Sequence, residues 1–184
     1  MSGSGGAREK REAKALMFDV DALYAALDAE RQARGMSWSD LTRAINDLFK
    51  NVPARPISTS TITGMRGRRA LEGNGVLQML VWLGRTPESF IPGRKGPARP
   101  EEMLPLVGDS RILRFDTPAI FAALDVQRAA RGMTWRQVAT EIGGVNVAGL
   151  TRLANGGRVG FPDVMRIAEW LRRPVAGFTR GFIR

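Results

Sequence analysis

The chain contains one stretch of sequence twice, and this repeat limits the folds that are open to it. Residues 18–45 align with residues 115–142 at an offset of 97, and 14 of the 28 aligned positions are identical. Within the alignment, Trp38 falls on Trp135. Chance does not produce such agreement in a chain of ordinary composition, so the sequence predicts a duplicated domain.

The two copies differ in length at one place and are separated by an irregular segment. Further along the chain the offset becomes 88, so the first copy has nine extra residues between positions 45 and 62. Fixed proline φ angles and permissive glycines argue against regular structure at 92–100. Short apolar runs at 103–107 and 111–115 could pack against either domain. We predict a flexible basic N-terminus at 1–14, a first domain at 15–91 with a long turn at 50–57, a linker at 92–112 and a second domain at 113–184.

The composition argues against most enzyme chemistry. The chain has 184 residues with no cysteine and no histidine, which leaves no disulfide, no Cys/His zinc site, no thiol nucleophile and no Ser-His-Asp arrangement. The longest apolar run, residues 79–83, is far shorter than the roughly 20 residues of a membrane helix. Paired acids such as Glu101 and Glu102 fall at predicted caps and in the linker. We therefore expect no enzymatic activity, no metal or other cofactor and no membrane contact.

The charge balance points to a polyanionic partner. The sequence has 28 Lys and Arg against 18 Asp and Glu, a net charge of +10 with a pI near 11.3. Such an excess is expected of a protein that meets nucleic-acid phosphates. However, 24 of the 28 cations are Arg. A GC-rich genome also favours arginine, and it is the alternative explanation of the positive charge. The N-terminus lacks the apolar core of a secretory signal, so we expect a cytoplasmic, nucleoid-associated protein of a bacterium or phage.

Each copy has the pattern of short helices with clear start signals. Capping boxes are predicted at Ser37 with Asp40 and at Thr134 with Gln137, where a side chain and the backbone satisfy each other. Other start and stop signals are the predicted caps Asp19, Ser58 and Asn146 and the helix-ending Gly35 and Gly132. No segment alternates convincingly with the period of a strand, so the predicted fold class is all-α.

The segments GMTWRQVA (132–139) and GVNVAGLTRLANG (144–156) of the second copy resemble the Cro/C1-type (Xre) helix-turn-helix family. The segment STSTITGMRG (58–67) of the first copy resembles it as well. The resemblance implies two tandem five-helix DNA-binding domains, joined here by a Pro/Gly/Arg-rich linker. Such domains are usually those of transcriptional regulators, with the third helix in the major groove.

The third helix of each copy supplies the candidates for reading bases. In the first copy, Ile62 and Met65 are expected to face inward and the polar side chains outward. The second copy offers apolar groups that can touch only a thymine methyl. It is therefore expected to read less sequence, or to have become a clamp or a docking surface. The base-reading candidates are Thr59, Ser60, Thr63, Val147, Ala148, Thr151 and Arg152.

A second set of side chains is predicted to contact the DNA backbone. Arginines that follow the third helices, with Arg152 among them, are placed where phosphates would pass, although exposed arginines are also common on any solvated surface. The two tryptophans at the start of the second helices are either packing residues or indole N–H donors to phosphate. The phosphate candidates are Trp38, Arg66, Arg68, Arg69, Trp135, Arg136, Asn155 and Arg158.

Together these observations predict a sequence-specific regulator that binds double-stranded DNA with two helix-turn-helix domains in one chain, as a monomeric pseudo-dimer or a homodimer. One alternative is a protein-interaction module that docks on another transcription factor or on RNA polymerase. Another is an architectural protein that coats DNA with little sequence preference. The linker is long enough to allow direct or inverted half-sites alike.

Overall fold

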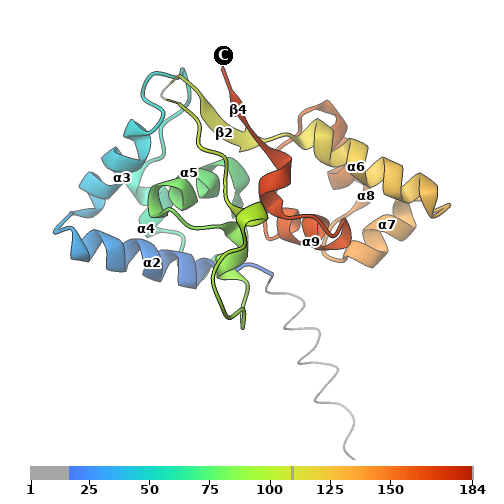
Figure 1. Cartoon of the computed structure of the whole chain (residues 1–184), viewed down its shortest axis with the longest axis horizontal. Helices are drawn as coiled ribbons and strands as arrows, with labels where there is room; N and C mark the ends of the chain where they lie inside the picture. Colours follow the sequence, from blue (N-terminus) through green and yellow to red (C-terminus); the bar gives the residue numbers. More distant parts are fainter. Residues whose placement is uncertain (1–16, 109, 184) are drawn as a thin grey trace, which may run out of the picture.

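The structure is a computed structural model that describes residues 17–108 and 110–183, and its two halves repeat the same order of helices (Figure 1). The first copy contains α2 (Val20–Ala33), α3 (Trp38–Asp47), α4 (Thr59–Thr63), β1 (Leu71–Glu72), α5 (Gly73–Leu83) and the 3₁₀-helix η1 (Pro87–Phe90). The second contains α6 (Thr117–Ala130), α7 (Trp135–Ile142), α8 (Val147–Arg152), η3 (Leu153–Asn155), β3 (Gly160–Phe161), α9 (Asp163–Trp170) and η4 (Val175–Phe178). The remaining elements are η2 (Pro100–Glu102), β2 (Ile112–Phe115) and β4 (Thr179–Phe182).

Side-chain caps fix where the helices begin, and the predicted caps are confirmed. Both capping boxes form, in α3 with Ser37 and Asp40 and in α7 with Thr134 and Gln137. The Asn146 side chain accepts a hydrogen bond from the backbone N–H of Gly149 at 2.7 Å and so starts α8. Asp19 and Ser58 cap α2 and α4 in the same way, and Gly35 and Gly132 adopt positive φ just after α2 and α6.

The prediction of a purely all-α fold is wrong in one respect, because the mostly helical chain also contains two small antiparallel sheets. β1 pairs with β3, which joins the two copies, and β2 pairs with β4. A two-residue strand has no periodicity to detect. β2 does not alternate either, because both Ile112 and Leu113 are buried. These strands form because a distant segment offers a partner, which local sequence does not report.

The buried side chains of the two copies form one continuous hydrophobic core. Leu23, Leu27 and Leu41 of the first copy belong to the same cluster as Leu124 and Val138 of the second. Around this core, equivalent cation–π pairs recur in the two copies. The Arg34 guanidinium lies 4.7 Å from the Trp82 ring centroid, and that of Arg131 lies 5.5 Å from the Trp170 ring centroid.

The segment predicted as a linker is packed against the rest of the molecule at Glu102. This carboxylate is fully buried and bonds Arg94 at 2.6 Å and Arg99 at 2.8 Å. Although burial opposes its ionisation, these hydrogen bonds lower the pKa of Glu102 to about 2. Nearby, Glu88 accepts a bond from the backbone N–H of Val175 at 2.8 Å and so ties η1 to the second copy, and burial raises its pKa. Glu102 thus holds its own segment together, and the bond between Glu88 and Val175 joins the first copy to the second.

β2 packs against the first copy although it precedes the second. The side chain of Gln78 donates to the carbonyl oxygen of Leu113 at 2.7 Å, and that of Asn74 accepts from the backbone N–H of Phe115 at 3.0 Å. Both bonds come from α5. The run at 111–115, whose side was left open by the sequence, thus contacts the helix of one copy while pairing with the last strand of the other.

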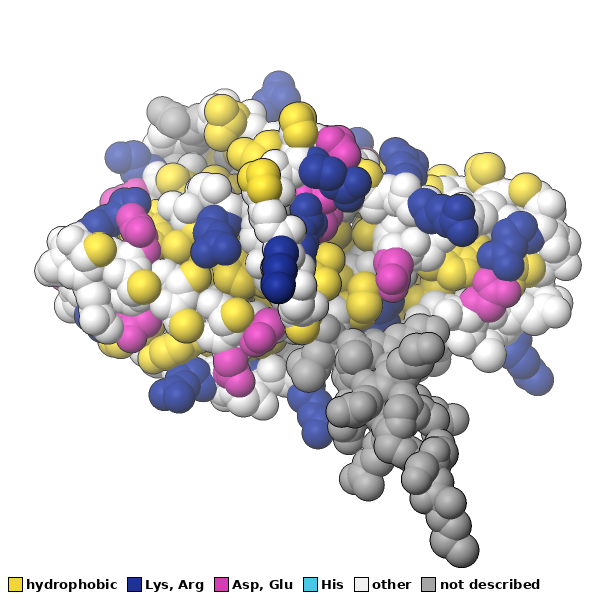
Figure 2. All heavy atoms as spheres, turned by 60° about the horizontal axis from the view of Figure 1, so that its bottom comes forward, with side chains coloured by type: hydrophobic (Ala, Val, Ile, Leu, Met, Phe, Trp, Pro, Cys, Tyr) yellow, Lys and Arg dark blue, Asp and Glu magenta, His cyan; other side chains and the backbone are white. Residues whose placement is uncertain are grey.

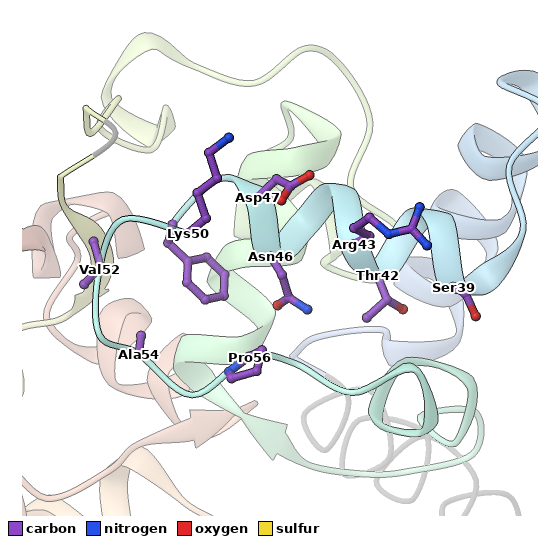
Figure 3. Close-up of a pocket in the computed structure, with 10 residues that line it drawn as sticks. Ser39, Thr42, Arg43, Asn46, Asp47, Lys50, Val52, Ala54 and Pro56 are labelled. Atoms are coloured by element: carbon purple, nitrogen blue, oxygen red, sulfur yellow. The ribbon is translucent and has the colours of Figure 1, made fainter.

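The extra residues of the first copy form a loop beside α3, and this loop carries Val52, Ala54 and Pro56 (Figure 3). Phe49 and Val52 are buried together with Ile112 of β2. The Asn46 side chain reaches from α3 across the loop and bonds both the N–H and the C=O of Ile57, each at 2.9 Å. The insertion is therefore tied to α3 immediately before α4 begins, and its buried side chains pack against the β2–β4 ribbon.

One backbone position differs between the copies in a way that predicts a stability change. After α5 the chain turns at Gly84 with φ 63°, and at the equivalent place after α9 it turns at Arg172 with φ 52°. A non-glycine residue in this region costs about 1 kcal/mol. We expect Arg172→Gly to raise the free energy of unfolding by about 0.5 kcal/mol after the extra freedom of the unfolded chain is subtracted. Urea denaturation measures this, with Gly84→Ala as the matched change that must destabilise.

Candidate nucleic-acid interface

The third helices of the two copies are related by a local two-fold axis. At the offset of 88, Glu72 is equivalent to Gly160, and these two residues pair with each other in the antiparallel β1–β3 ladder. On one side of this pair Leu71 meets Phe161, and on the other the N–H of Gly73 donates to the carbonyl oxygen of Val159 at 3.0 Å. Equivalent segments that pair with each other make a self-complementary contact, as in a two-fold dimer. α4 and α8, which precede the two strands, are therefore related in the same way.

A row of aromatic rings packs tightly behind this ladder. Phe161 lies between Phe18 and Phe115, with centroid distances of 4.5 Å and 5.8 Å. Gly73 makes the close approach possible, since a Cβ there would lie 2.4 Å from the carbonyl oxygen of Val159 and 2.8 Å from the Phe115 ring. The seam between the copies is thus close-packed, and it holds α4 and α8 in one relative orientation.

The exposed face of α4 presents hydroxyl groups. Ile62 is fully buried, whereas Ser60 and Thr63 are exposed and Thr59 is half-buried. The Thr63 hydroxyl donates its proton to the carbonyl oxygen of Thr59 at 3.1 Å. It therefore offers lone pairs outward, which suits the amino groups of adenine or cytosine in a major groove. The geometry agrees with the predicted inward and outward faces of this helix.

The exposed face of α8 is mostly apolar. Val147 is 37% exposed and Ala148 is exposed beside it. The Thr151 hydroxyl is half-buried and bonds the carbonyl oxygen of Val147 at 3.0 Å, as Thr63 does in the first copy. Arg152 is exposed, and it adds one cation to this face. The two helices thus share a scaffold but differ in what they present.

The arginines predicted as phosphate contacts are all exposed, and one of them, Arg66, interacts electrostatically with the Asp28 carboxylate. Each is exposed and makes no ion pair within the part of the chain that the structure describes, although Arg66 also lies over the Tyr24 ring at 5.4 Å. By contrast, Arg34 and Arg131 are bonded to Glu30 and Glu141. Asn155 is also exposed. The unpaired arginines of the predicted set are Arg66, Arg68, Arg69, Arg136, Arg152 and Arg158.

The two tryptophans at the starts of α3 and α7 pack against the preceding helices. The Trp38 ring lies 5.1 Å from the Tyr24 ring and 4.7 Å from the Arg31 guanidinium. Trp135 repeats this arrangement with a stacked Phe121 at 4.9 Å and Arg128 at 5.2 Å. Both indoles are half-buried, so packing accounts for their rings, and phosphate contact by their N–H groups stays a prediction.

Sequence reasoning missed one basic group. Arg55 of the insertion and Arg114 of β2 line a cavity together with Arg158 of the second copy. The three residues lie in unrelated segments, and only the folding of the chain brings them together. Arg158 thus lies beside the start of α4 of the first copy, where Ser58 and Thr61 line the same cavity.

Positive charge is spread over both copies. Figure 2 shows Lys and Arg side chains over both halves of the visible face, with Asp and Glu among them.

Within the described residues no cluster of acids could hold a metal ion. In the same part of the chain, no helix has the length and apolar character needed to cross a membrane.

Comparison with protein-family models, with curated proteins and with solved structures finds no match. The resemblance to the Cro/C1-type family therefore depends on the residues quoted above.

A pair of glycines in the first turn of α5 tests the role of the seam. We expect Gly73→Ala to lower the free energy of unfolding by about 2 kcal/mol or more, because the new methyl group collides with backbone and with the Phe115 ring. Gly75→Ala is the control, since its nearest atom is the Glu72 carboxylate at 3.5 Å. Thermal and urea unfolding of both variants measure the difference. Equal stabilities of the two variants would contradict a close-packed seam.

Proposed function

We propose that the protein binds double-stranded DNA and regulates transcription, with α4 and α8 as its two reading helices. The observation that carries the proposal is the β1–β3 register, which relates the two helices by a local two-fold axis. Inverted half-sites on DNA have the same symmetry. One chain would thus do what a two-fold dimer does, and this two-fold relation favours inverted over direct half-sites.

The proposal divides the work between the copies. α4 supplies hydroxyl groups that discriminate between bases, through Thr59, Ser60 and Thr63. α8 supplies Val147 and Ala148, which suit a thymine methyl. The unpaired arginines hold the phosphate backbone and provide most of the sequence-independent affinity. The two half-sites would therefore differ in sequence.

A second candidate function is docking on another protein through α8. The exposed Val147 and Ala148 favour it, because an apolar helix face can bind a partner as well as a groove. In this case α4 alone would read DNA, or neither helix would. The two experiments below separate the candidates.

The first experiment measures DNA affinity against salt. We expect the logarithm of the binding constant to fall with the logarithm of salt concentration with a slope more negative than about −4, because two domains release several counterions. Arg152→Gln should weaken binding to all sequences alike and reduce the slope by about 1. Lys95→Gln, an exposed cation of the linker, is the control. A flat response, or no binding at low salt, would reject DNA as the ligand and favour docking.

The second experiment selects bound duplexes from random sequence. We expect two unlike half-sites in inverted orientation, bound by a single chain. The triple change of Thr59, Ser60 and Thr63 to alanine should remove sequence preference from one half-site only, since each lost base contact costs about 1–3 kcal/mol. Selection of a direct repeat, or of a perfect palindrome bound by two chains, would contradict the single-chain pseudo-dimer.

A further inference from the structure

A cavity of about 360 Å³ lies at the junction of five segments from both copies. Its walls are the start of α4, the first turns of α5, the insertion, β2 and the loop before β3. A volume of this size accommodates a small organic molecule. The side chains that line it fall into a charged group and an apolar group.

The charged group consists of three guanidinium groups that nothing in the described part of the chain neutralises. Arg55, Arg114 and Arg158 line the cavity and make no hydrogen bond or ion pair with a described residue. One carboxylate, that of Glu72, also lines it, but this group accepts from the backbone N–H of Gly75 at 2.8 Å. The cavity therefore carries an excess of positive charge that an anion would offset.

Arg114 is in a further unfavourable position. In the β2–β4 ladder it lies directly opposite Arg180, and like charges at this spacing destabilise a strand pair. Arg180 is bonded to Asp116 at 3.1 Å, so that acid is already engaged. An anion in the cavity would relieve the repulsion felt by Arg114.

The apolar group distinguishes this cavity from a plain phosphate-binding surface. Phe49, Val76, Met79 and Ile112 are buried residues that line it. A DNA phosphodiester group has no apolar surface to bury against these side chains, whereas the ring of an aromatic acid would bury its surface there. Hydroxyl groups of Ser58 and Thr61 complete the wall at the start of α4.

The three arginines come together at only one of the two places that the duplication makes equivalent. The first copy has Met17 at the position of Arg114 and Ala70 at the position of Arg158, while Arg55 lies in the insertion, which the second copy lacks. The duplicated scaffold therefore does not require these charges for folding. They occur only where the insertion closes the cavity.

We propose that this cavity binds a small aromatic carboxylate or phosphate ester, whose anionic group is held by Arg55, Arg114 and Arg158 and whose ring contacts the apolar floor. Binding would draw together the insertion, β2 and the loop before β3 around the start of α4. A resulting change in DNA affinity rests on the proposed function, whereas binding of the anion does not.

The test uses the full chain without DNA and three anions: benzoate, phenyl phosphate and inorganic phosphate. Calorimetry gives affinities, and NMR follows the backbone amides of Ser58, Thr61 and Gly75. We expect the two aromatic anions to shift these amides and to bind more tightly than inorganic phosphate. Benzamide, which has the shape of benzoate without its charge, should bind at least about tenfold more weakly. Failure of all three anions to shift these amides would overturn the proposal, as would equal binding of benzamide.

Variants locate the site. Arg55→Gln and Arg114→Gln should each weaken benzoate binding about fivefold or more, since each removes a charge-assisted hydrogen bond. Arg111→Gln removes the same charge outside the cavity and should leave the affinity unchanged. If the cavity variants weaken binding of a DNA duplex but not of benzoate, the arginines serve the DNA backbone and the proposal is wrong. If benzoate binds as expected and no duplex binds, the proposed function fails while this site stands.

Discussion

The backbone ladder between β1 and β3 is the contact on which the rest of the structure depends. Two copies of about 80 residues would each bury a small core, and domains of that size are marginally stable alone. The ladder brings the copies together with Glu72 opposite Gly160, and the absence of a side chain at Gly73 lets the Phe115 ring approach the backbone. Phe161 then lies between one aromatic ring from each copy. The result is one hydrophobic core, in which the aromatic row stabilises both halves at once.

The two copies share the interactions that build the scaffold but differ in the residues that we propose contact a ligand. The pairs of Arg34 with Trp82 and Arg131 with Trp170 recur, as do the capping boxes and the Thr hydroxyls bonded within α4 and α8. All of these act within one copy. By contrast, the outward residues of the third helices and the arginines of the cavity differ. A duplicated domain can change its exposed residues with little effect on folding, which is why the scaffold can stay the same while the exposed faces of α4 and α8 differ.

How much the sequence could predict follows from how far each interaction reaches along the chain. The caps at Asp19 and Asn146 and the inward face of α4 depend on neighbours within four residues, and they could be predicted. The pairing of Leu71 with Phe161 joins residues far apart in the chain, and no local pattern announces it. The buried Glu102 is a similar case, because an acid in a Pro/Gly-rich segment is expected to be exposed to solvent. Its burial and its ion pairs with two arginines depend on the folded structure. The cavity was invisible for the same reason.

A rigid connection between two DNA-binding domains limits the half-site spacings that they can bind together. A free linker gives the second head an effective concentration set by chain length and lets it search many spacings. Here the ladder, the aromatic row and the bond from Val175 to Glu88 join the two copies, and so fix α4 and α8 in one arrangement without a ligand. A fixed arrangement loses little conformational entropy on binding but accepts only one half-site spacing. The insertion adds a further connection between the copies, since it is bonded to α3 through Asn46 and Ile57, leads directly into α4, and packs on the β2–β4 ribbon through Phe49 and Val52.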